Sequence, residues 1–136
     1  LEPLSLSLSP LVSYFNLRHE FLNMPTLAGV RDAAQRLTQL CDASANNAMR
    51  DDAFLIRLDA TGWLQQVSAL LSASMHALNA LTRGVSVLVH CPDGADATSQ
   101  IVSVTLLAME PRYRTLLGFC ELIEREWVLM GHKVRR

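Results

Sequence analysis

One short segment constrains the fold of this chain more than any other: an apolar run that leads into a tight loop and then into a helical pattern. The run is Val-Ser-Val-Leu-Val at residues 85–89, the loop covers residues 90–97, and the helical pattern begins at Thr98. β-branched residues favour strands, and a short run that is apolar on both faces is typical of a strand inside a parallel sheet. We therefore predict a buried strand, a loop and a helix at this point of the chain, within the order helix, helix, buried strand, loop, helix, helix.

Apolar periodicity predicts three further helices outside this unit. Apolar residues recur every three or four positions over residues 26–40, 63–81 and 115–130. Thr61 is the expected N-cap of the second of these helices, and Gly84 is expected to end it. The small polar residues 42–50 predict a surface loop, and the alternation of Leu and Ser over residues 4–9 predicts a half-buried strand.

Composition excludes several classes of protein. The chain has 136 residues, 12 Lys and Arg against 13 Asp and Glu, and 50% hydrophobic residues. This balance excludes a generally basic nucleic-acid binder and an intrinsically disordered chain, and no apolar run approaches the roughly 18 residues of a membrane span. Because it starts at Leu1 without a Met, we expect the chain to be a piece of a longer protein.

The cysteines predict neither a disulfide framework nor a zinc site. There are three of them, an odd number, widely spaced and without a Cys-x-x-Cys pair: Cys41, Cys91 and Cys120. A structural zinc site needs four ligands at short spacings. We therefore expect no metal and no cofactor, and a reducing, cytoplasmic setting fits the cysteine usage.

The loop that begins at Cys91 has the layout of a phosphate site. In a strand–loop–helix unit the loop N–H groups and the helix N-terminus converge on one point, where they bind an anion and stabilise a thiolate. Cysteine-dependent phosphatases also need an arginine six positions after the cysteine, because its planar fork binds two phosphate oxygens in the transition state. The sixth position after Cys91 is Ala97. The sequence therefore predicts a nucleophile without its phosphate clamp.

Residues 90–100, His-Cys-Pro-Asp-Gly-Ala-Asp-Ala-Thr-Ser-Gln, resemble the signature loop of the myotubularin family, His-Cys-Ser-Asp-Gly-Trp-Asp-Arg-Thr-Ala-Gln. Residues 110–119 are similar to the family's Asp-Pro-Tyr-Tyr-Arg-Thr-Ile-x-Gly-Phe, and residues 122–133 to its Leu-Ile-Glu-Lys-Glu-Trp…Gly-His-Lys. With Gly-Trp-Leu at 62–64, the resemblance spans about residues 24–133. It implies that residues 1–136 are an incomplete, C-terminal-containing part of one myotubularin-like phosphatase domain. The fold that the resemblance implies is the α/β cysteine-phosphatase fold, in which helices pack around a central sheet and the strand, loop and helix at residues 85–109 carry the site.

The resemblance also implies a role for each loop position. The family's nucleophile corresponds to Cys91 and its proposed general acid to Asp96, whereas its arginine and tryptophan correspond to Ala97 and Ala95. Both catalytic positions are therefore expected to be vestigial, and the chain is expected not to be a working enzyme. The residues expected to form the phosphate loop are Pro92, Asp93, Gly94, Ala95, Ala97 and Thr98.

The candidate residues also have structural interpretations. Cys91 is a small residue that packs well between a strand and a loop, and Asp96 is a good cap for the following helix. Arg114 is expected to pair with Glu124 or Glu126. Three aromatic residues at helical spacing are expected in the core: Trp63, Phe119 and Trp127.

For function, the resemblance implies a pseudophosphatase that acts as a scaffold or regulatory partner of an active phosphoinositide 3-phosphatase of the same family. Such a protein would be cytoplasmic, peripheral to endomembranes, and involved in lipid metabolism and membrane trafficking, without a nucleic-acid partner. Two alternatives stay open. One is an active or residually active phosphatase of phosphatidylinositol 3-phosphate and the 3,5-bisphosphate, whose missing cation comes from elsewhere in the longer protein. The other is a module that binds a phosphoinositide membrane lipid without hydrolysing it.

Overall fold

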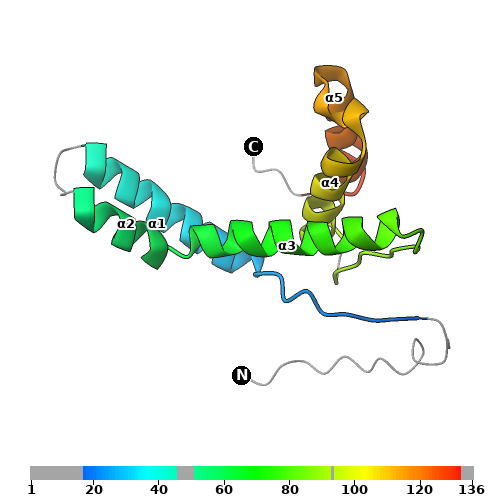
Figure 1. The fold of residues 1–136 in the computed structure, drawn as a ribbon. Helices are drawn as coiled ribbons and strands as arrows, with labels where there is room; N and C mark the ends of the chain where they lie inside the picture. Colours follow the sequence, from blue (N-terminus) through cyan, green and yellow to red (C-terminus); the bar gives the residue numbers. More distant parts are fainter. Residues whose placement is uncertain (1–16, 46–50, 93, 133–136) are drawn as a thin grey trace.

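The computed structural model describes residues 17–45, 51–92 and 94–132, and its regular structure is helical (Figure 1). Two helices, α1 (Leu27–Ala45) and α2 (Asp51–Ala60), pack beside each other at one end of the long helix α3 (Trp63–Thr82). Helix α4 (Ala97–Met109) crosses the other end of α3. The chain then forms a 3₁₀ helix, η2 (Pro111–Arg114), the helix α5 (Leu116–Ile123) and a π-helical turn, η3 (Glu124–Val128).

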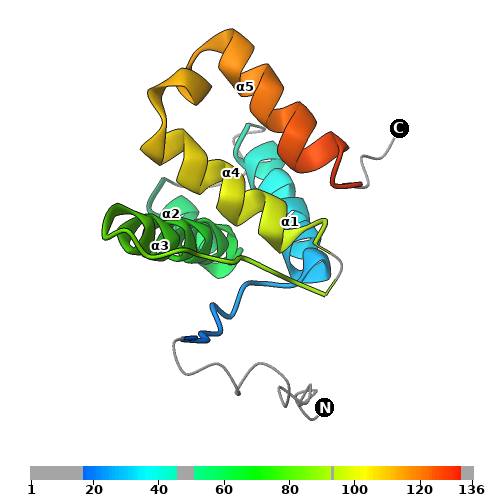
Figure 2. The same cartoon turned by 90° about the vertical axis from the view of Figure 1, so that its right-hand side faces the viewer.

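Small residues make the contact between α3 and α4, which Figure 2 shows nearly along the axis of α3. Ala73, Ser74 and Ala77 of α3 are buried, as are Ile101 and Thr105 of α4. The Thr105 hydroxyl lies 2.7 Å from the Ile101 carbonyl oxygen of its own helix and 3.2 Å from the Ser74 carbonyl oxygen of the other. Because small side chains let two helix backbones approach closely, this contact fixes the position at which α4 begins.

A glycine allows an equally close contact between η2 and α5. A Cβ atom built on Gly118 would lie 2.1 Å from the Arg112 carbonyl oxygen, so no larger residue fits there without a backbone shift. Thr115 caps α5, because its hydroxyl oxygen accepts from the Gly118 N–H at 3.2 Å. The buried Tyr113 lies under the Arg125 guanidinium, which is 5.5 Å from the ring centre and donates to the tyrosine hydroxyl at 2.9 Å. This corner orients the C-terminal turn that follows α5.

The expected buried strand at residues 85–89 is not formed. Residues 85–90 have no regular secondary structure, and Val85 and Leu88 are 55% and 83% exposed. A strand needs a neighbouring strand for its backbone hydrogen bonds, and none of residues 17–45, 51–92 and 94–132 forms one. The predicted burial is therefore wrong for this structure, and the central sheet remains a prediction.

The four predicted helices are found near their predicted positions, but the structure contains further helical segments. At the C-terminal side α5 ends at Ile123 and continues as the π-helical turn η3, where one α-helix to residue 130 was predicted. Two other differences lie at the N-terminal side. The first helix continues to Ala45, so that residues 42–45 are helical and not part of a loop. Helix α2 was not predicted, because its apolar residues 53–56 are consecutive and conceal the helical period. The expected strand at residues 4–9 and the rest of the expected loop, residues 46–50, lie outside the described residues.

The ends of α3 agree with the sequence in most respects. Gly84 follows the helix with a φ of 77°, in the left-handed region that ends helices, as expected. At the other end Gly62 is the residue before the helix, and the Thr61 hydroxyl oxygen accepts from the Trp63 N–H at 3.2 Å. Thr61 was expected to be the N-cap residue itself. It lies one residue before the N-cap, Gly62, and its hydroxyl caps the N–H of the first helical residue.

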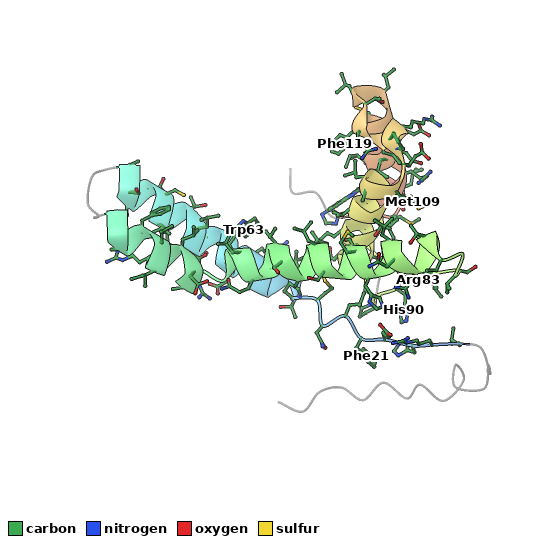
Figure 3. All side chains as sticks on the ribbon, in the orientation of Figure 1. Phe21, Trp63, Arg83, His90, Met109 and Phe119 are labelled. Carbon is green, nitrogen blue, oxygen red and sulfur yellow. The ribbon has the colours of Figure 1, made fainter. Side chains whose placement is uncertain are left out.

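Many apolar side chains on the outer surfaces of the helices are exposed. Phe119, expected in the core, is 44% exposed, and Leu116 and Leu117 beside it are 80% and 83% exposed. Trp63 is part-buried (Figure 3 shows both aromatic residues). Among the described residues, no helix combines the length and the apolar character that a membrane-spanning segment requires.

Candidate functional site

The candidate site is the loop of residues 91–98, here called the phosphate loop, which connects the irregular segment 85–90 to the start of α4. The part-buried Cys91 lies at its beginning, and its sulfur accepts a hydrogen bond of 3.1 Å from the Thr98 hydroxyl. Burial raises the pKa of the Cys91 thiol. Hydrogen bonds from the Thr98 hydroxyl and from the backbone N–H groups of Thr98, Asp96 and Gly94 outweigh this effect and bring the pKa below its ordinary value. The loop therefore already surrounds the sulfur with donors.

The position of the expected phosphate clamp is occupied by a methyl group. Ala97 is the first residue of α4 and is part-buried, and its side chain has neither a charge nor a hydrogen-bond donor. Gly94 has a φ of 72°, a conformation that a side chain would strain, and no atom lies within 4 Å of the Cβ that it lacks. Pro92 is exposed, and Asp93 lies outside the described residues. The described loop residues thus surround the Cys91 sulfur with backbone donors, and the position of the expected arginine holds an alanine.

Asp96 occupies the N-cap position of α4, but its carboxylate makes no capping hydrogen bond. Instead, Oδ1 of Asp96 lies 3.4 Å from Nδ1 of His132. The capping role expected for this side chain is therefore wrong. The carboxylate points toward the C-terminal turn because the segment after η3 folds back over this end of the loop.

His132 also contacts the loop backbone, and sequence reasoning missed this contact. Its Nδ1 atom lies 2.7 Å from the Ala95 carbonyl oxygen. The imidazole ring packs edge-on against Trp127, with 4.7 Å between ring centres, and the Trp127 indole N–H donates to the Ser103 hydroxyl at 2.7 Å. The Gly-His-Lys motif contains this histidine, but 37 residues separate it from Ala95, so that only the fold brings them together.

A segment before α1 reaches the entrance of the loop. The ring of His19 lies 6.1 Å from the ring of His90, the residue before Cys91, and 4.6 Å edge-on from Phe21. Glu20 pairs with His76 of α3 at 2.6 Å, which holds the segment alongside the helix. Figure 3 shows Phe21 and His90 on this side of the molecule.

The arginines near η2 and η3 form ion pairs different from those expected. Arg112 pairs with Glu121 at 2.5 Å, and Arg125 pairs with Glu126 at 2.6 Å. The expected pair of Arg114 with Glu124 or Glu126 is not among the ion pairs of the described residues, and Arg114 is exposed. Within that part of the chain, no cluster of His, Cys, Asp and Glu is close enough to hold a metal ion.

The comparisons with known proteins identify the family. The model of the family described as the myotubularin-like phosphatase domain matches residues 7–136. This chain belongs to the myotubularin family. It is 38% identical over 122 residues to the Homo sapiens phosphatidylinositol-3-phosphate phosphatase MTMR7, a stretch that covers 89% of this chain and 18% of that protein.

Two further relatives cover the same share of the chain. The Gallus gallus phosphatidylinositol-3,5-bisphosphate 3-phosphatase MTMR8 is 38% identical over 122 residues, or 19% of its length. The Homo sapiens phosphatidylinositol-3,5-bisphosphate 3-phosphatase MTMR6 is 34% identical over 122 residues, also 19% of its length. The chain therefore spans about a fifth of the length of these myotubularin relatives, and the phosphate loop lies inside the matched region.

Proposed function

We propose that this chain is the loop-bearing part of a myotubularin-related pseudophosphatase, which acts as a scaffold or regulatory partner of an active phosphoinositide 3-phosphatase. The observation that carries the proposal is Ala97 at the first position of α4, where the family's signature has an arginine. An arginine directed at a transferring phosphoryl group contributes about 10³–10⁵ to the rate in other phosphoryl-transfer enzymes. A methyl group supplies none of this stabilisation.

The polar side chains beside the loop support the proposal because the contacts of Thr98 and His132 are with the loop itself, and neither side chain stands in for the missing arginine. The Thr98 hydroxyl donates to the Cys91 sulfur, and His132 lies against the Ala95 carbonyl oxygen and the Asp96 carboxylate. Asp96 places a carboxylate beside the loop, which would repel a phosphate in the absence of a counter-charge. The loop would therefore hold a phosphate weakly and would not stabilise the charge that develops during its transfer.

In the complete protein, residues 85–90 would become a strand of the central sheet of the α/β domain. Their sequence has a strong strand preference, and their exposed valine and leucine side chains are apolar surface that further parts of the domain can cover. Because the relatives are about five times as long as the matched region, there is ample chain to supply neighbouring strands. Residues 1–136 would accordingly be an incomplete part of one phosphatase domain.

The proposed partner and location are chosen to agree with the lipid substrates in the relatives' names. MTMR7 and MTMR8 are named as phosphatases of phosphatidylinositol phosphates, which are membrane lipids. A pseudophosphatase of this family would bind such an active relative and work at the same membranes, in the cytoplasm and peripheral to endomembranes. Membrane trafficking and lipid metabolism are the processes that it would affect.

A second candidate function is phosphoinositide binding without hydrolysis. The observation that favours it is the convergence of the Gly94, Asp96 and Thr98 N–H groups on the Cys91 sulfur. These groups are donors for an anion and belong to the backbone, so that the loss of the arginine leaves them in place. In this function the protein would bind the lipid headgroup and release no phosphate.

The test is a single-turnover assay with phosphatidylinositol 3-phosphate and the 3,5-bisphosphate, using the full-length protein and its Cys91→Ser variant. We expect no phosphate release above that of the variant. A rate within about tenfold of an active relative would make the protein a working phosphatase and would refute the proposal. In parallel, addition of the full-length protein to active MTMR7 should change the rate of MTMR7, whereas lipid binding without this effect would favour the second candidate.

A further inference from the structure

The contact between His132 and the phosphate loop determines the direction in which the Asp96 N–H of the loop points. Nδ1 of His132 lies 2.7 Å from the Ala95 carbonyl oxygen. A carbonyl oxygen only accepts, so the hydrogen of this bond resides on Nδ1. The Ala95 carbonyl is therefore held on the side of the loop that faces the C-terminal turn.

The geometry of the peptide unit transmits this contact to the sulfur. The Ala95 carbonyl and the Asp96 N–H belong to one planar trans peptide, in which the C=O and N–H bonds point in opposite directions. When the carbonyl points to His132, the Asp96 N–H must point the other way. On that side lies Cys91, and the Asp96 N–H is one of the backbone donors that lower the pKa of its thiol.

The imidazole ring is itself held in place from two sides. Gly131 adopts a φ of 78°, which turns the chain after η3, and the His132 N–H donates to the Trp127 carbonyl oxygen at 2.9 Å. The Trp127 ring packs against the imidazole and is anchored by its hydrogen bond to Ser103 of α4. The histidine side chain is 19% exposed. The ring is thus fixed relative to α4, the helix at whose start the phosphate loop ends.

We infer that His132 is a positioning residue of the phosphate loop: it fixes the Ala95–Asp96 peptide so that the Asp96 N–H points at Cys91 and at a phosphate group above it. Without this contact the peptide can rotate and present its carbonyl oxygen to the anion instead. The inference depends on the proposed function only in naming phosphate as the anion. The effect on the thiolate of Cys91 is independent of whether the protein hydrolyses a lipid.

Among the described residues, the titratable groups near this end of the loop include one of the loop itself and one of the segment directly before it, with His19 beyond the latter, 6.1 Å from the ring of His90. Asp96 lies 3.4 Å from the imidazole, and its side chain is 33% exposed. His90 precedes Cys91 and is exposed. The test variants below leave both of these residues unchanged, so that a difference in Cys91 reactivity follows from position 132.

The experiment measures the rate of alkylation of Cys91 by iodoacetamide as a function of pH, in the full-length protein, by mass spectrometry of the peptide that contains Cys91. His132→Phe keeps a ring against Trp127 and removes the donor, whereas His132→Asn places an amide N–H near the position of Nδ1. In the phenylalanine variant we expect the Asp96 N–H to lose its hydrogen bond to the Cys91 thiolate. The pH midpoint of Cys91 alkylation should therefore rise, and alkylation at pH 7 should be about threefold to tenfold slower. The asparagine variant should retain the wild-type profile.

An unchanged pH midpoint in a folded His132→Phe variant would overturn the inference. A merely structural histidine would lower the thermal stability of both variants and leave this midpoint alone. If the phenylalanine variant does not fold, long-range ¹H–¹⁵N spectra of the histidine-labelled wild-type protein decide the question. A proton on Nδ1 of His132 supports the inference, and an unprotonated Nδ1 overturns it. Phosphate release by the wild type would refute the proposed function and leave these outcomes intact.

Discussion

Cys91 and Ala97, six positions apart, differ in how much their roles depend on side chains. The donors that lower the pKa of Cys91 are the Thr98 hydroxyl, whose effect is the largest of them, and backbone N–H groups, which every residue except proline supplies. The clamp at position 97 depends on one guanidinium, which no backbone group imitates. A single substitution therefore removes transition-state stabilisation and leaves the thiolate stabilised. In the proposed pseudophosphatase, this separation would leave Cys91 with a lowered thiol pKa in the absence of turnover.

The Thr98 hydroxyl donates to the Cys91 sulfur and lowers the pKa of the thiol. Thr98→Val should raise this pKa, and Thr98→Ser, which keeps the hydroxyl, should not. Because the folded-state pKa is depressed, the thiolate stabilises the fold fully above the ordinary thiol pKa, and this contribution is lost as the pH falls through the lower folded value. The valine variant should therefore lose stability relative to the serine variant in alkaline solution. The pH midpoint of Cys91 alkylation and thermal unfolding at two pH values measure both effects.

Restoring the two missing side chains should recover part of the chemistry. Ala97→Arg adds the bidentate phosphate contact at the start of α4, and Ala95→Trp leaves the carbonyl that contacts His132 in place. We expect phosphate release from phosphatidylinositol 3-phosphate at least about tenfold above the same double variant with Cys91→Ser. Pro92 limits the recovery, because it lacks an N–H that a serine would supply. A folded double variant with neither release nor faster thiol labelling would leave Cys91 as a packing residue.

At the scale of elements, sequence reasoning succeeded wherever a local pattern determines the structure. Apolar periodicity and Gly84 located α3, and the pattern after Cys91 located the start of α4 to within one residue. It failed where the outcome depends on what lies far away in the chain. The contact of His132 with Ala95 spans 37 residues and involves a carbonyl, which any residue could supply.

Gly118 provides a test of the corner between η2 and α5. Gly118→Ala places a Cβ atom 2.1 Å from the Arg112 carbonyl oxygen, which belongs to the backbone and cannot rotate away. We expect a loss of about 1–3 kcal/mol in the free energy of unfolding, because either η2 or α5 has to shift. Gly29→Ala in α1 is the matched control: its nearest atom is the Thr26 hydroxyl oxygen at 3.4 Å, and alanine favours a helix. The midpoints of thermal unfolding compare the two, and equal midpoints would contradict the close contact.

At the scale of the whole molecule, the described residues form a helical layer with its apolar outer surface uncovered. Leu88 in the irregular segment and Leu116 and Leu117 at the start of α5 are each at least 80% exposed, so that these apolar side chains gain stability only where another part of a protein covers them. The strand preference of residues 85–89 is a property of the sequence, whereas pairing and burial require neighbours. For this reason the sequence predicts a buried strand, whereas the structure has the segment exposed. Among the described residues there is no strand with which it could pair.

Leu88 offers the test of the proposed sheet, because the two possibilities predict different energies for the same substitution. If residues 85–90 form an inner strand of the full-length protein, Leu88→Asp buries a charge and should lower the free energy of unfolding by more than about 2 kcal/mol. If the segment stays as exposed as it is here, where Leu88 is 83% exposed, Leu88→Asp should change the free energy of unfolding by no more than about 0.5 kcal/mol. Gln35→Asp on the exposed side of α1 controls for the added charge. Thermal unfolding of the two full-length variants distinguishes the cases. We expect only Leu88→Asp to destabilise the protein strongly, because a short apolar run of this kind is typical of a strand that is covered on both faces.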